Sequence, residues 1–79
     1  MNTLAKTIKI VNEILDNLQE DNIQTLEMKT ETRYAGIRIS LIEDLDKETL
    51  EKIILLVKDL PSVDETFINP KLVVVGLKF

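Results

Sequence analysis

The sequence predicts an α+β fold, a two-layer α/β sandwich with two helices on one face of a four-stranded, mainly antiparallel sheet. Three patterns predict it. Two segments carry apolar residues at helical spacing, two segments alternate between apolar and polar residues, and one segment near the C-terminus is apolar on both faces. Helices with one apolar stripe and strands with one apolar face are buried together in two layers. The 79 residues suffice for a single domain, residues 1–79.

The first helix is expected over residues 3–20, with Asn2 or Thr3 as its N-cap. Its apolar residues recur at alternating spacings of four and three, at Leu4, Ile8, Val11, Leu15 and Leu18. This spacing places them on one face of a helix. The stripe covers only about two heptads and a coiled coil needs about three or four, so we interpret it as a face that packs on a sheet.

A β-hairpin is expected next, from residues 24–32 and 36–42 joined by a turn at residues 33–36. In the first strand one face carries Leu26, Met28 and Thr30, and the other carries Glu27, Lys29 and Glu31. In the second strand the apolar face consists of Ile37, Ile39 and Leu41. One face of this hairpin is therefore expected in the core and the other in solvent.

The second half of the chain repeats the order helix, strand, strand. A helix is expected over residues 47–60, because Asp46 can cap its start and Pro61 follows its end. Residues 63–69 form a third strand. Residues 72–79 form the fourth, whose apolar start on both faces is typical of a central strand. The complete order is αββαββ.

This order resembles a circularly permuted ferredoxin-like fold, in which the first strand of βαββαβ has moved to the C-terminus. That strand is central in the sheet, as the pattern of residues 72–75 requires. The resemblance implies that residues 71–79 lie between 63–69 and 36–42, with 24–32 as an edge. The charges of residues 27, 29 and 31 fit an edge that resists pairing with other chains. The alternative is two ββα-like units that exchange or dimerise with another strand order.

A two-layer sandwich leaves one face of its sheet bare, and exposed apolar surface of this kind is often an interface. We expect this face to carry Leu72, Val74 and Gly76, joined by Arg38, Ser40, Ile42, Thr66 and Ile68. The opposite phase of the last strand also fits the pattern. At the hairpin tip lie Arg33 and Tyr34, two residue types enriched in binding hot spots. The candidate protein-interface residues are Arg33, Tyr34, Arg38, Ile42, Ile68, Leu72 and Val74.

The inventory of reactive residues is sparse, so we expect no enzyme, no cofactor and no metal. There is no cysteine or histidine, and Gly36 and Gly76 stand 40 residues apart, too far for a phosphate-binding loop. The acidic stretch 43–48 lacks the alternating ligands and glycine of a calcium loop, so we interpret it as a solvated loop with a helix cap. Glu65 lies in a strand that alternates with core residues, so one interpretation is an inward carboxylate with a functional role. We favour the other, in which Glu65 lies at the sheet margin or pairs with Lys71 or Lys78.

Charge and hydropathy restrict the partners. A net charge of −4 with scattered cations does not suit nucleic acid. The longest apolar run, residues 53–57, is far too short to span a bilayer, and no basic start precedes an apolar run, so we expect no signal peptide and a cytoplasmic location.

We therefore expect a small non-enzymatic protein-interaction or self-associating module, of bacterial or phage origin, with a homodimer through the bare sheet face as its simplest form. One alternative is an acidic inhibitor that occupies a basic nucleic-acid-binding surface of a target protein. Another is a small-ligand sensor domain.

Overall fold

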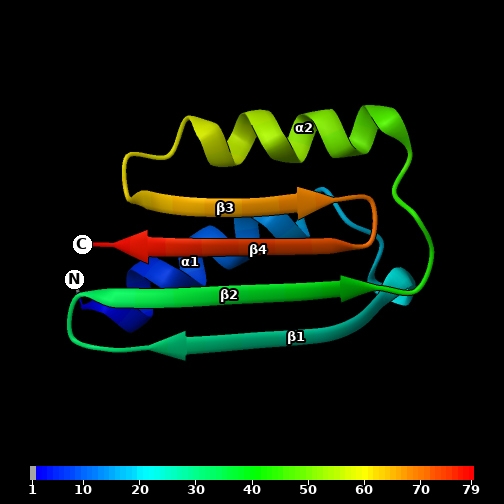
Figure 1. Cartoon of the computed structure of the whole chain (residues 1–79). Helices are drawn as coiled ribbons and strands as arrows, with labels where there is room; N and C mark the ends of the chain where they lie inside the picture. The colour runs from blue at the N-terminus through cyan, green and yellow to red at the C-terminus, as the bar shows by residue number, and fades with distance from the viewer. Residues whose placement is uncertain (1) are drawn as a thin grey trace.

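Helices and strands follow one another in the predicted order αββαββ (Figure 1). The computed structural model describes residues 2–79. Its elements are α1 (Thr3–Leu15), η1 (Glu20–Asn22, a single 3-10 turn), β1 (Ile23–Thr30), β2 (Tyr34–Leu41), α2 (Lys47–Lys58), β3 (Val63–Asn69) and β4 (Leu72–Lys78).

The first helix is shorter than predicted and ends at Leu15 rather than at residue 20. The Asn17 side chain turns back and donates a hydrogen bond of 3.0 Å to the Glu13 carbonyl oxygen. Such a bond competes with the helical pattern, and Asp and Asn are poor helix formers. Leu18 nevertheless packs against the core from the turn that follows.

All four strands pair antiparallel in the order β1-β2-β4-β3. This order confirms that the last strand is central, between β2 and β3, and that β1 is an edge. The likeness to a permuted ferredoxin-like fold stays a prediction.

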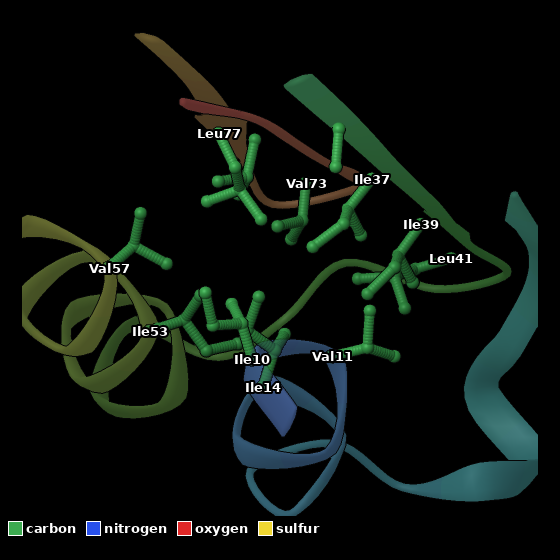
Figure 2. Packing of buried hydrophobic residues seen from close by; sticks show 12 residues of the cluster. Ile10, Val11, Ile14, Ile37, Ile39, Leu41, Ile53, Val57, Val73 and Leu77 are labelled. Carbon is green, nitrogen blue, oxygen red and sulfur yellow. The ribbon is translucent and has the colours of Figure 1, made fainter. Parts of the chain in front are cut away.

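The core lies between the sheet and the two helices, which share one side of it. Its buried apolar side chains are Ile10, Val11 and Ile14 of α1, Ile53 and Val57 of α2, Ala35, Ile37, Ile39 and Leu41 of β2, and Val73, Val75 and Leu77 of β4 (Figure 2). Neither β1 nor β3 contributes a fully buried residue. All fully buried residues of the sheet therefore come from its two central strands, β2 and β4.

The phase of β4 is settled by this core, because Val73, Val75 and Leu77 are buried against the helices and Leu72, Val74 and Gly76 face the other way. The expected phase of β3 was wrong after its first residue. A β-bulge between Val63 and Glu65 inserts one extra residue into the strand. One extra residue reverses the faces of everything that follows.

Both helices begin with a side-chain cap. The Oδ1 of Asn2 accepts a hydrogen bond of 2.8 Å from the Ala5 N–H, and the Oδ1 of Asp46 accepts one of 2.7 Å from the Thr49 N–H. The caps confirm Asp46 as the start of the second helix. The Thr49 backbone N–H bonded to its carboxylate lowers the pKa of Asp46 below the ordinary value of 3.8.

The Asp46 cap predicts a specific pH dependence of stability. Because the folded state lowers its pKa, ionised Asp46 stabilises the fold above pH 3.8, and this contribution is lost as pH falls through the folded-state pKa. Asn is also a good N-cap but carries no charge. We expect wild type to be more stable than Asp46→Asn in urea at neutral pH, with the difference shrinking well below pH 3.8. A difference that is constant over this range would contradict the role of the charge.

No helix within residues 2–79 has the length and apolar content needed to cross a membrane.

Candidate interaction surface

The face of the sheet opposite the helices is uncovered, and Figure 1 is seen from this side, with α1 behind the strands. At its centre Gly36 of β2 is the register partner of Gly76 of β4. Lys29 of β1 lies beyond Gly36, and Glu65 of β3 lies beyond Gly76. The row Lys29, Gly36, Gly76 and Glu65 crosses all four strands with no side chain at its two central positions. We call this row the trough.

Larger side chains border the trough on both sides. One border is the cross-strand row of Glu27, Arg38, Val74 and Phe67, and the other contains Glu31, Tyr34 and Lys78. The Lys78 Nζ lies 5.8 Å from the centre of the Tyr34 ring, so the cation rests over the aromatic face. The resulting hollow has a volume of about 630 Å³ and is shallow and open to solvent.

Space, rather than backbone conformation, distinguishes the two glycines. Neither has a positive φ, so both positions accept other residues on backbone grounds. A Cβ at Gly36 would meet no atom within 4 Å, whereas a Cβ at Gly76 would lie 2.8 Å from Glu65 Cγ. The Glu65 side chain thus leans over Gly76 and closes one end of the trough, while the Gly36 end is open.

The structure brings four of the seven predicted interface residues onto this open face, namely Tyr34, Arg38, Leu72 and Val74. Arg33 is exposed in the adjoining turn. Glu65 also lies on this face, on the edge strand β3, which confirms the prediction that it sits at the sheet margin.

Two of the seven are placed elsewhere. Ile68 pairs with buried Val73 and packs against the core, so its predicted outward position was wrong, as was that of Thr66. The bulge in β3 is the physical reason. Ile42 follows the end of β2, is 54% exposed and lines a separate hollow at that end of the molecule. It does not belong to the trough.

Sequence reasoning missed Phe67, which is 58% exposed and the largest apolar side chain on the open face. Alternation from Val63 placed it inward, and only the bulge turns it out. The pairing of Gly36 with Gly76 was also missed, since it depends on the register between strands far apart in sequence.

The second hollow, of about 570 Å³, lies where the α1–β1 and β2–α2 connections meet, and it is acidic. Its carboxylates are Asp16, Asp21, Glu43, Asp44 and Asp46. The Asn22 side chain holds the two connections together, because it accepts from the Glu43 N–H at 2.8 Å and donates to the Glu43 carbonyl oxygen at 3.1 Å. Among residues 2–79 no three acidic groups are arranged to hold a metal ion.

The chain matches no protein-family model, and the searches of curated proteins and of solved structures gave no match.

Proposed function

We propose that this chain is a non-enzymatic interaction module that binds a partner protein through the trough on the open face of its sheet. The observation that carries this proposal is the pairing of Gly36 with Gly76 in the middle of an otherwise side-chain-covered face. A protruding apolar or aromatic side chain of a partner fits such a gap and would lie directly on the strand backbone.

The residues around the trough support a protein as the partner. Tyr34 and Arg38 are of types enriched among binding hot spots, and they stand on opposite sides of the trough. Val74 and Phe67 supply apolar surface beside it. Charged groups at the periphery, Glu27, Lys29 and Glu31, complete an apolar centre with a polar rim, which is the usual anatomy of an interface.

Filling the trough tests the proposal. The variant Gly36→Leu places a side chain into open space, so we expect it to fold normally. The smaller variant Gly36→Ala should raise the free energy of unfolding by about 0.5 kcal/mol, because glycine is costly within a strand. In capture experiments from cell extract, a partner bound by wild type should bind Gly36→Leu about tenfold more weakly or not at all, as expected when a hot-spot contact is lost.

The matched control is Leu55→Ser, which changes an exposed leucine on α2, away from the trough. It should retain the partner. A partner that still binds Gly36→Leu would contradict the proposal. If the same partner is lost on replacing Glu43 and Asp44 by their amides, and on raising the salt concentration, the acidic hollow is the binding surface, as an acidic inhibitor would require.

A further inference from the structure

β1 presents an unpaired strand edge. It is the terminal strand of the sheet, and it is exposed over nearly its whole length. The Glu31 N–H donates to the Tyr34 carbonyl oxygen at 2.7 Å, so the odd-numbered residues near this end of β1 bond to β2. Backbone groups alternate in direction along a strand. The N–H and C=O groups of Leu26, Met28 and Thr30 therefore point away from the sheet.

An apolar margin accompanies this edge on the helix side. Leu26 and Met28 occupy the core-facing side of β1, opposite Ile39 and Ile37, yet they are 45% and 40% exposed. The helix layer does not reach far enough to cover them.

Two residues of α1 extend the same margin. Figure 2 shows Ile10 on the side of α1 toward Ile53 and Val11 on the side toward β2. At 100° per residue, Val11 lies between Ile10 and Ile8 around the helix axis, and Leu4 lies close to Val11. Ile8 and Leu4 thus project beyond Val11 toward β1, and they are 42% and 46% exposed.

The opposite edge of the sheet differs. β3 carries a bulge between Val63 and Glu65, which breaks the regular edge. Helix α2 lies beside it, and Ile54 and Val57 share a hollow with Ile68 there. Bulges and covering helices are devices that protect strand edges from other chains. β1 also has a bulge, between Ile23 and Thr25, but from Leu26 to Thr30 its pairing is regular and its residues are exposed.

We propose that two copies of this chain pair antiparallel along β1, around a two-fold axis at Met28, to form a continuous eight-stranded sheet. In this register Met28 faces Met28 of the second copy, and Glu27 faces Lys29 of the second copy, twice by symmetry. The outward N–H and C=O groups of Leu26, Met28 and Thr30 in one copy then form hydrogen bonds with those of the other copy. The apolar margins of both copies meet on the helix side of the joined sheet.

The charges on β1 favour this register over its neighbours. A pairing centred on Glu27 places the two Glu27 carboxylates together, and one centred on Lys29 opposes Lys29 to itself and Glu27 to Glu31. Like charges directly opposite each other destabilise a sheet, whereas opposite charges stabilise it. A pairing centred on Thr30 would set the hairpin turn against the strand. Among the registers centred on Glu27, Met28 and Lys29, only the one centred on Met28 sets unlike charges opposite each other.

Glu27 and Lys29 are both free to serve this contact. Glu27 lies opposite Arg38 on β2 but makes no ion pair with it within the described residues. Lys29 lies opposite Gly36, which has no side chain, and its contact with Glu31 is a loose 4.0 Å pair between exposed groups.

Charge reversal tests the register. In sedimentation equilibrium at low salt, wild type should be dimeric at high micromolar concentration. The variants Glu27→Lys and Lys29→Glu should each raise the dimer dissociation constant about tenfold, because each turns two attractive pairs into repulsive ones. An equal mixture of the two variants should regain the wild-type affinity as a heterodimer. The double variant should regain it as a homodimer. Circular dichroism should show all of them folded.

Val74→Asp, which borders the trough, and Leu55→Ser on α2 are the controls that keep this inference separate from the trough. Val74 pairs with Arg38 of β2 and Phe67 of β3, so neither residue lies beside β1, and both variants should dimerise as wild type does. A wild-type monomer at high micromolar concentration would overturn the inference. So would a dimer that resists both charge reversals. A dimer weakened by Val74→Asp alone would instead place self-association on the open face.

Discussion

Replacing Ile14 by alanine is expected to cost about 3 kcal/mol of the free energy of unfolding, within the usual range for such deletions. Ile14 is completely buried, on α1 at the point where both helices and the sheet meet (Figure 2). A domain of this size has only about 4–12 kcal/mol of stability in total. One deletion therefore removes a large share of it, measurable as a lower midpoint in urea denaturation followed by circular dichroism.

The matched control is Ile8→Ala, the same chemical deletion on the same helix. Ile8 is 42% exposed and lies outside the buried cluster, so its replacement should cost less than about 1 kcal/mol when the chain is monomeric. Equal losses at the two positions would mean that α1 does not pack on the sheet in the described orientation.

Elements whose boundaries are set by local chemistry are the ones predicted well from the sequence. The second helix starts at Lys47 as expected, since the Asp46 cap acts on residues within three positions of it. The two strands of the first hairpin are found within two residues of their predicted limits, because their alternation is uninterrupted. The central position of β4 follows from apolar residues on both of its faces.

Features that depend on one residue of backbone geometry were not predictable in the same way. Strict alternation from Val63 would place Phe67 on the core side of β3 and Ile68 on the open side. Asp64 is the extra residue of a bulge, and the bulge exchanges Phe67 and Ile68 between the two faces. The end of α1 was missed for a related reason, because the stripe continues to Leu18 after the helix itself has ended.

The sequence predicted several residues of the candidate site but not the trough between them. Tyr34, Arg38, Leu72 and Val74 could be assigned to one face from alternation alone. The trough could not, since it requires knowing that β2 and β4 pair with Gly36 beside Gly76. Each glycine leaves one position on its strand without a side chain. Only the register between β2 and β4 shows that these two positions are neighbours and form a single gap.

The largest difference in stability loss is expected when each of two adjacent valines of β4 is replaced by aspartate. Val75 is completely buried beneath the helices, so Val75→Asp places an unpaired carboxylate in the apolar core. The penalty for burying an isolated charge, together with the lost packing, should exceed about 5 kcal/mol, enough to unfold a domain of this size at neutral pH. Circular dichroism should show loss of the folded signal.

Val74→Asp makes the same chemical change one residue earlier, on the half-buried open face. Its carboxylate remains in contact with water, so the stability loss should be about 1 kcal/mol, set mainly by strand propensity. Because Val74 borders the trough, this folded variant should also bind a partner protein more weakly, whereas Leu55→Ser should not. If Val74→Asp unfolds the chain and Val75→Asp does not, the two faces of β4 are reversed. That result would contradict both the assignment of the open face and the proposal that a partner protein binds there.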